Sequence, residues 1–151
     1  GGLIGATLSA YGYSRYKKLE FLKYLDVFAI GIPLGHAIGR IGCYLSGYHF
    51  GKVTSVPWAI MFEGQLRHPS PLYEIIFLVP LFFVVQKLSK KERFDGWLFA
   101  VYIIGYALIR FVLDFFRADP AYLGLTVAQY LAIALFAAAA GFIYVNDDRF
   151  K

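Results

Sequence analysis

The sequence predicts an all-α protein, a polytopic bundle of transmembrane helices with four full spans and one partial span at its N-terminal end. Hydrophobic residues make up 59% of the 151 residues and charged residues only 17%, and the mean hydropathy is +0.57. Such a chain is too apolar for an ordinary soluble domain. Apolar segments long enough to cross a bilayer alternate with polar connections. The basic residues lie beside these segments, so the positive-inside rule explains the net charge of +5 and nucleic acid is excluded as a partner.

The first apolar segment is shorter than the others. Residues 1–14 are rich in small residues and stop at the basic run Arg15-Tyr16-Lys17-Lys18. A spanning helix needs about 20 residues. Because no Met opens the chain, we interpret this segment as the end of a span that begins outside the sequence, which makes the chain an N-terminally truncated domain.

The second apolar segment, residues 24–44, is expected to be a complete span. Gly31, Gly35 and Gly39 follow one another at four-residue spacing, so they share one face of the helix and permit close approach of a neighbouring helix. Pro33 lies inside this segment and is expected to kink it.

Residues 45–70 form the longest polar connection and are expected to be an outward-facing ordered loop or short hairpin. Trp58 in this loop suits the membrane interface. Ser70 and Pro71 then resemble an N-cap and a first helical residue, which predicts that the third span covers residues 72–88.

Residues 96–116 and 125–145 complete the predicted bundle, and residues 1–151 are expected to form a single membrane domain. Lysine indicates the orientation. When the spans alternate in direction, seven of the eight lysines fall on the same side as the C-terminus, and only Lys52 falls on the other side. The positive-inside rule therefore predicts a cytoplasmic C-terminus.

Arginine does not follow this distribution, because Arg40, Arg67, Arg110 and Arg117 all fall on the outer side. At about 1.5 Å per residue, Arg40 and Arg110 lie about 24 and 21 Å above the inner boundary of a hydrocarbon core about 30 Å thick. An arginine at such a depth is normally kept only where it faces a partner, an anion or water. We therefore expect the two guanidinium groups to bind one anionic lipid headgroup near the outer leaflet.

The fourth span carries its polar side chains on one stripe. Tyr106, Arg110, Asp114 and Arg117 are spaced four, four and three residues apart. Arg110 and Asp114 are able to pair, and Arg117 keeps the stripe positive. An internal ion pair that only locks the bundle is the alternative, but it does not explain Arg40 at a matching depth. The planar fork of arginine binds phosphate through two parallel hydrogen bonds, which favours the functional interpretation.

The start of the third helix brings together His68, Tyr73 and Glu74. His68 is a candidate general base, with a hydrogen-bonding structural role as the equal alternative. Glu74 is either a site residue or an acid that stabilises the N-terminus of the helix.

Three other side chains have less specific surroundings. We expect His36 to be structural, His49 to be a minor site candidate, and Cys43 to be inert because an apolar neighbourhood raises the pKa of a thiol. The histidines lack metal-ligand spacing, so no metal site is predicted.

Three motifs occur in order along nearly the whole chain. They are Gly39-Arg40-Ile41-Gly42 with Gly47 and Gly51, Arg67-His68-Pro69-Ser70-Pro71-Leu72-Tyr73-Glu74, and Tyr106-x-x-x-Arg110-Phe111-x-x-Asp114-Phe115-Phe116-Arg117. Together they resemble the phosphatidylglycerol:prolipoprotein diacylglyceryl transferase family of bacteria. Gly1-Gly2-Leu3 is similar to the end of the family's His-Gly-Gly motif.

The resemblance implies a multi-pass enzyme of the bacterial inner membrane with an outward-facing active site. The implied reaction transfers diacylglycerol from phosphatidylglycerol, a membrane lipid, to the lipobox cysteine of a preprolipoprotein signal peptide, forming a thioether and releasing glycerol phosphate. It needs no metal or nucleotide cofactor. The catalytic residues it implies are Arg40, Arg110, Tyr106 and His68, and the substrate-binding residues are Arg117, Asp114, Glu74, Tyr73, Gly39, Gly42 and Ser46.

The chain also departs from the common family pattern. Cys43 replaces an asparagine, Ser46-Gly47-Tyr48 replaces Asn-Gly-Glu, and Asp114 replaces a glutamate. The alternatives to a transferase are therefore a catalytically degenerate lipid-binding relative and a helical subunit of a transporter. A transporter is expected to carry ionisable groups near the midplane and repeated halves, and the sequence has neither.

Overall fold

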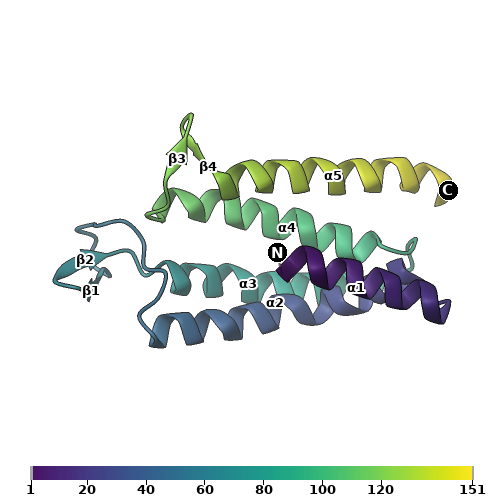
Figure 1. Cartoon of the computed structure of the whole chain (residues 1–151), viewed down its shortest axis with the longest axis horizontal. Coiled ribbons are helices and arrows are strands. Elements are labelled where there is room, and N and C mark those ends of the chain that lie inside the picture. Colours follow the sequence, from purple (N-terminus) through teal and green to yellow (C-terminus); the bar gives the residue numbers. More distant parts are fainter. Residues whose placement is uncertain (1, 151) are drawn as a thin grey trace.

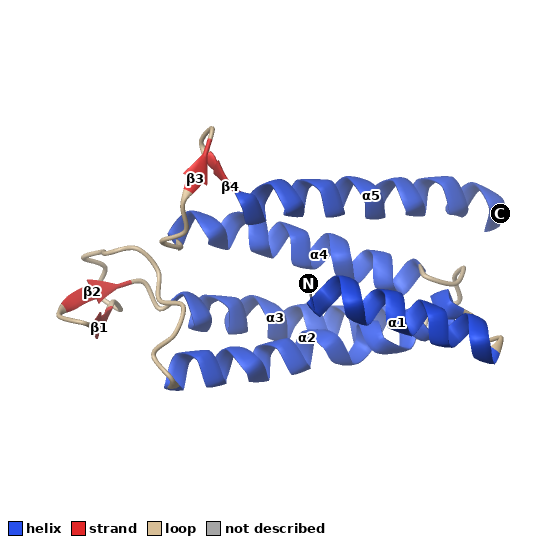
Figure 2. Cartoon of the chain, viewed as in Figure 1, coloured by secondary structure: helices blue, strands red, loops and turns tan. Residues whose placement is uncertain are grey.

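Helices run along a common long axis in the computed structural model, which describes residues 2–150 (Figures 1 and 2). The α-helices are α1 (Gly2–Lys17), α2 (Phe21–Leu45), α3 (Ser70–Leu88), α4 (Trp97–Leu113) and α5 (Val127–Phe150). A short 3₁₀ helix, η1 (Asp114–Phe116), extends α4. Four helical segments in the described part are long and apolar enough to cross a membrane: Phe21–Leu45, Ser70–Leu88, Trp97–Phe116 and Val127–Asp147. The prediction of a helical membrane bundle with four full spans is confirmed.

Two antiparallel hairpins connect the helices at one end of the bundle. Strands β1 (Ile60–Phe62) and β2 (Gln65–Arg67) pair in the connection between α2 and α3, as the sequence predicted for this loop. Strands β3 (Ala121–Tyr122) and β4 (Leu125–Thr126) pair before α5, where no hairpin was predicted. The α1–α2 connection, the α3–α4 connection and the C-terminus lie at the opposite end (Figure 1). The chain therefore alternates between the two ends as the sequence predicted.

Two helix boundaries differ from the prediction for local reasons. Ser70 is the first residue of α3 and Pro69 is its N-cap, whereas the sequence predicted Ser70 as the cap. The Ser70 amide donates to the His68 carbonyl at 2.9 Å, so the chain turns into the helix one residue early. Helix α5 begins at Val127 instead of residue 125, because Leu125 and Thr126 belong to strand β4.

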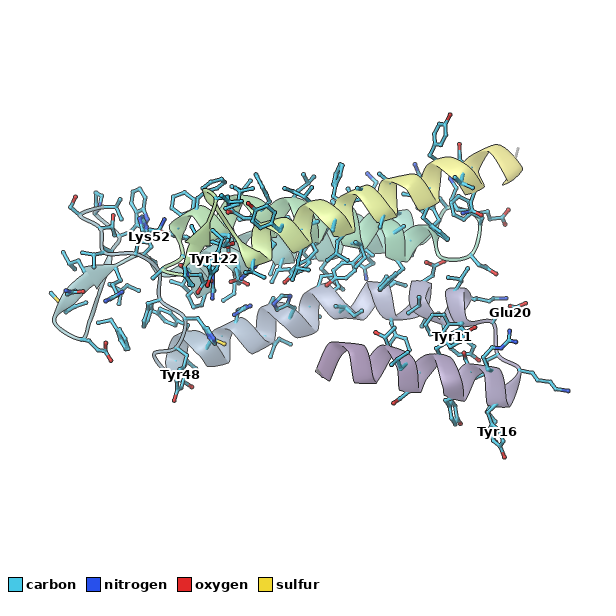
Figure 3. All side chains as sticks on the ribbon, turned by 45° about the horizontal axis from the view of Figure 1, so that its top comes forward. Tyr11, Tyr16, Glu20, Tyr48, Lys52 and Tyr122 are labelled. Carbon is cyan, nitrogen blue, oxygen red and sulfur yellow. The ribbon has the colours of Figure 1, made fainter. Side chains whose placement is uncertain are left out.

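The core of the bundle lies between α2, α3 and α4. Leu78, Leu81 and Val85 of α3 are buried against residues of the other two helices. A Cβ atom built on Gly105 of α4 would lie 2.5 Å from Leu81 Cδ1, so a larger residue here would require the Leu81 side chain to move where α3 and α4 come close together. Helix α5 packs on α4, while α1 lies against α2 and away from α5 (Figure 3).

The glycine face of α2 has no such neighbour among the described residues. No atom lies within 4 Å of a Cβ built on Gly31, Gly35 or Gly39. The close helix–helix approach that was expected at these glycines is thus absent from the described chain. A close approach of two helices is observed instead at Gly105, between α3 and α4. Pro33, which was expected to kink α2, lies inside this helix, and its side chain is buried.

Asp26 of α2 caps the N-terminus of another helix. Its carboxylate accepts hydrogen bonds from the amides of Gly96 at 2.7 Å and Phe99 at 2.8 Å, at the start of α4. We expect Asp26→Ala to lower the free energy of unfolding by about 0.5–2 kcal/mol, the usual cost of losing a helix cap. Thermal unfolding in detergent measures the loss. Asp95→Ala, at an exposed position next to Gly96, is the control, and an equal loss in both variants would contradict the capping role.

Candidate functional site

Three arginines meet at one buried carboxylate near the hairpin end of the bundle. Glu74 of α3 is only 3% exposed. Its Oε2 lies 2.7 Å from Nε of Arg40 on α2. Its Oε1 lies 3.5 Å from Nη1 of Arg110 on α4 and 3.5 Å from Nη1 of Arg117 after η1. The two arginines for which the sequence indicated a similar depth thus share a single counter-charge.

Asp114 supplies a second buried carboxylate to this cluster. Its Oδ1 lies 3.0 Å from Nη2 of Arg110 and 3.6 Å from Nε of Arg117, so the pair expected along α4 is present. The Thr126 hydroxyl donates a hydrogen bond to Oδ2 of Asp114. The Gln129 side chain in turn accepts from the Thr126 amide at 2.9 Å and donates to the Phe111 carbonyl at 3.2 Å. Helix α5 is thereby attached to the arginine cluster.

A third carboxylate is more accessible than the other two. Asp119 has a side-chain exposure of 42%, and its Oδ2 accepts a hydrogen bond from Nε of Arg117 at 2.8 Å. This hydrogen bond lowers the pKa of the Asp119 carboxyl below its ordinary value. Nη2 of Arg110 lies 4.0 Å from the same oxygen. Because Asp119 is at the surface, an incoming anion is able to compete with it for the two arginines.

One nitrogen in the cluster lacks a hydrogen-bond partner. Nη1 of Arg117 is buried and makes no hydrogen bond among the described residues, although Glu74 is 3.5 Å away. An unsatisfied buried donor is costly and is uncommon in folded proteins. Oε1 of Glu74 and Oδ1 of Asp114 are likewise buried without a hydrogen bond, so charge pairing and not hydrogen bonding holds this part of the cluster together.

A cavity of about 310 Å³ opens beside these arginines, between α2, α4 and α5. One part of its wall is basic and polar, and the α5 part is apolar. This combination fits an anionic group that carries an apolar chain. The lining residues are Arg40, His49, Tyr106, Ala107, Arg110, Arg117, Ala128, Leu131, Ala132 and Leu135.

The residues predicted from the sequence take different positions relative to this cavity. Arg40, Tyr106, Arg110 and Arg117 line it, and Glu74 and Asp114 hold the arginines. Gly39, Gly42 and Ser46 are exposed on α2 or at its end, and His68 and Tyr73 belong to a separate cluster; none of these five lines the cavity. His36 accepts a hydrogen bond from Nε of Arg40 at 3.3 Å, in agreement with the structural role expected for it.

His68 and Tyr73 lie in an aromatic cluster at the start of α3. The Trp58 indole donates to the Tyr73 hydroxyl at 2.7 Å, and this hydroxyl lies 3.0 Å from Nδ1 of His68. The Phe116 ring packs against both rings at 5.3 and 5.9 Å. These contacts are the ones expected if His68 has a hydrogen-bonding structural role. A catalytic role for His68 stays a prediction.

The loop after α2 holds the backbone of Arg117 in place. Gly51 forms a bridge with Arg117, and the Gly51 amide donates to the His68 carbonyl at 2.8 Å. The Lys52 amide donates to the Phe116 carbonyl at 2.9 Å. These backbone hydrogen bonds connect the loop after α2 to the arginine cluster.

Gly51→Ala is expected to disrupt this connection. The added Cβ would overlap the Phe116 carbonyl and lie 2.9 Å from Cβ of His68, so the loop must move. Overpacking of this kind costs about 1–3 kcal/mol, which thermal unfolding measures. Gly31→Ala, where no atom lies within 4 Å of the new Cβ, is the control and is expected to show no loss. An unchanged unfolding temperature for Gly51→Ala would contradict the predicted clash.

Sequence reasoning missed Thr126 and Gln129. Thr126 ends strand β4 and Gln129 lies in the first turn of α5, in a stretch without charged residues, and only the hairpin brings Thr126 to Asp114. In the sequence, Gly124 is a local signal of a turn there; in the structure, Leu123 and Gly124 both have positive φ, as a two-residue hairpin turn requires. Among the described residues, no group of three or more His, Cys, Asp or Glu side chains is arranged to hold a metal ion.

The fold and the site define a multi-pass helical membrane protein in which an arginine cluster borders a partly apolar cavity. The family model described as prolipoprotein diacylglyceryl transferase matches residues 1–145. The chain therefore belongs to the prolipoprotein diacylglyceryl transferase family.

Individual relatives agree with this family. The chain is 39% identical over 143 residues to the phosphatidylglycerol–prolipoprotein diacylglyceryl transferase of Campylobacter lari, covering 90% of this chain and 52% of that protein. It is 35% identical over 159 residues to the enzyme of the same name from Chlorobaculum tepidum, covering 99% of this chain and 55% of that protein. The chain thus spans about half the length of the curated relatives it matches.

Proposed function

We propose that this chain is the lipid-binding part of an enzyme that transfers the diacylglyceryl group of phosphatidylglycerol to the lipobox cysteine of a preprolipoprotein signal peptide. The names of the relatives support the two substrates. The observation that carries the proposal is the cavity itself, in which Arg40, Arg110 and Arg117 adjoin the apolar side chains Leu131 and Leu135 of α5. The phosphate of the lipid binds at the arginines, and the glyceryl and acyl groups extend along α5.

The reaction is a displacement at carbon. The cysteine thiol loses its proton, and the sulfur attacks the glycerol carbon that carries the phosphate ester. The bond between this carbon and its oxygen breaks, and the electron pair leaves with glycerol phosphate. Arg40 and Arg110 stabilise the negative charge that gathers on the departing group, and Tyr106 lies beside them as a hydrogen-bond donor.

The proposed orientation places residues 1–151 in the bacterial inner membrane as one domain, with residues 45–70 and the active site facing outward. The C-terminus is then cytoplasmic. Two observations support this orientation. Seven of eight lysines fall on the side of the C-terminus by sequence alternation, and both hairpins lie at the opposite end (Figure 1).

The test uses the full chain in nanodiscs that contain phosphatidylglycerol, with a lipobox peptide as acceptor. Mass spectrometry is expected to detect a peptide that is heavier by one diacylglyceryl group, together with released glycerol phosphate. A peptide with serine in place of the cysteine is the control and stays unmodified. An unmodified cysteine peptide, in the presence of bound phosphatidylglycerol, would contradict transfer.

That contrary result would instead support the catalytically degenerate lipid-binding relative. The observation that favours this second candidate is Tyr48, which replaces a carboxylate of the common family pattern and does not line the cavity. The transporter alternative is less well supported, because the arginine cluster lies toward the hairpin end of the bundle and not at its middle.

A further inference from the structure

Three buried polar side chains join the start of α5 to the end of α4. Thr126, Gln129 and Asp114 are 7%, 2% and 1% exposed. The β3–β4 hairpin carries the chain from one helix to the other at this point (Figure 2). Burial of a polar group is costly unless the group is hydrogen-bonded, and these three side chains are held in one network of hydrogen bonds.

Thr126 and Gln129 form a capping box at the start of α5. The Thr126 hydroxyl oxygen accepts from the Gln129 amide at 3.1 Å, and Oε1 of Gln129 accepts from the Thr126 amide at 2.9 Å. Nε2 of Gln129 also donates to the Phe111 carbonyl, in the last turn of α4, at 3.2 Å. The Thr126 side chain is therefore fixed relative to both helices.

The capping box leaves the hydroxyl proton of Thr126 for Asp114. A hydroxyl has one proton to donate and accepts through its lone pairs. Capping uses the oxygen as acceptor, and the proton is donated to Oδ2 of Asp114. Oδ1 of this carboxylate lies near the arginines but makes no hydrogen bond. Within the described chain, the Thr126 hydroxyl therefore supplies the hydrogen bond that orients the Asp114 carboxylate.

The orientation of this carboxylate determines the orientation of Arg110. Nη2 of Arg110 lies 3.0 Å from Oδ1 of Asp114, and its Nη1 lies 3.5 Å from Oε1 of Glu74. A guanidinium group is planar and binds two oxygens of a phosphate only when its plane is turned toward them. Rotation of the Asp114 carboxylate would therefore turn the plane of Arg110 in the cavity wall.

We propose that Thr126 is a positioning residue for Arg110 that acts through Asp114, an inference that rests on the proposed function. Thr126 does not line the cavity of the arginines. Its hydroxyl holds the Asp114 carboxylate, and this carboxylate turns the guanidinium plane toward the place where negative charge gathers on the departing phosphate. A small misplacement of such a group lowers a reaction rate by as much as about 10²-fold.

The decisive comparison is between Thr126→Val and Thr126→Ser in the full chain in nanodiscs. Valine keeps the shape of the side chain without the hydroxyl, whereas serine keeps the hydroxyl. We expect Thr126→Val to lower kcat by roughly 10-fold to 10²-fold. Its KM for phosphatidylglycerol should stay close to the wild-type value, because Arg110 keeps its charge beside the phosphate. Thr126→Ser should transfer at nearly the wild-type rate.

Tyr130→Phe is the matched control. It removes the hydrogen bond from the Tyr130 hydroxyl to the Tyr122 carbonyl, which is 3.0 Å long and also joins α5 to the hairpin. This hydrogen bond does not involve Asp114, so kcat should stay as in the wild type. A loss of kcat in Tyr130→Phe equal to that in Thr126→Val would show that any loosening of the hairpin has this effect, and would overturn the positioning role.

A double variant tests whether the effect of Thr126 passes through Arg110. Lysine at position 110 has no planar fork to orient. Thr126→Val should therefore lower kcat much less in the Arg110→Lys background than in the wild type, since residues that act through one another are not additive. An equal further loss in that background would overturn the proposed route.

NMR of arginine side chains, in protein labelled with ¹⁵N-arginine, gives a measurement that does not depend on transfer. The Arg110→Lys variant identifies the Arg110 signals by their absence. These signals should shift in Thr126→Val and stay in place in Thr126→Ser and Tyr130→Phe. Unshifted Arg110 signals in Thr126→Val, or an unchanged kcat, would overturn the role of Thr126 and leave the transferase intact. A wild-type protein that forms no thioether would contradict the proposed function, while the Arg110 signals would still decide whether Thr126 orients the guanidinium.

Discussion

Glu74→Gln is expected to lower the free energy of unfolding by about 3–5 kcal/mol, the cost of breaking a buried ion pair from one side. The substitution preserves the shape of the side chain and removes only its charge. Arg40 has Glu74 as its single carboxylate partner among the described residues. Arg110 and Arg117 keep Asp114, so the uncompensated charge falls mainly on Arg40. Thermal unfolding in detergent or nanodiscs measures the effect.

The matched control for this variant is Glu20→Gln. Glu20 also pairs with a basic residue, Lys23, at 3.3 Å, but both side chains are more than 60% exposed. Exposed pairs contribute about 0–1 kcal/mol, so the control should unfold at nearly the wild-type temperature. Equal, small effects in the two variants would show that the arginines do not depend on Glu74 as their counter-charge.

The role of Glu74 illustrates what the sequence left open. Its position near the start of a helix favoured stabilisation of the helix N-terminus and a site role about equally. Helical periodicity defines which residues share a face, but not toward which neighbouring helix that face turns. Only the packing of α3 against both α2 and α4 brings Glu74 between Arg40 and Arg110.

The meeting of Arg40 and Arg110 was easier to predict. A helix rises by a nearly constant amount per residue, so depth in the membrane follows from residue number once a span is recognised. The loops lack such a regularity. The pairing of His68 with Tyr73 and the entry of His49 into the cavity depend on the path of the loop after α2, which no periodic pattern describes.

The β3–β4 hairpin shows the same limit on a smaller scale. Leu123 and Gly124 form its turn with positive φ, and leucine is not among the residues that are typical of such a turn. The sequence therefore extended α5 back to residue 125. For this reason the sequence did not indicate that Thr126 donates a hydrogen bond to Asp114.

Under the proposed function, Arg110→Lys is expected to reduce kcat for diacylglyceryl transfer by about 10²–10³-fold, as for loss of one donor to a developing negative charge. Lysine keeps the charge but lacks the planar fork that bonds two oxygens at once. Asp114 and Glu74 retain a cationic partner, so the folded state should be little changed. The measurement is the initial rate of thioether formation at saturating phosphatidylglycerol. Arg93→Lys, near the opposite end of the bundle, is the control and should be as active as the wild type.

A double variant then separates catalysis from the ion pair. Arg110→Ala alone leaves Asp114 buried beside Arg117, whereas Arg110→Ala with Asp114→Ala removes both members of the 3.0 Å pair. Removing a whole buried pair is often far less destabilising than removing one partner. We therefore expect the double variant to unfold at a higher temperature than Arg110→Ala while its transfer rate stays just as low. Recovery of the rate together with the stability would mean that Arg110 serves only to neutralise Asp114, and the phosphate would then need another ligand.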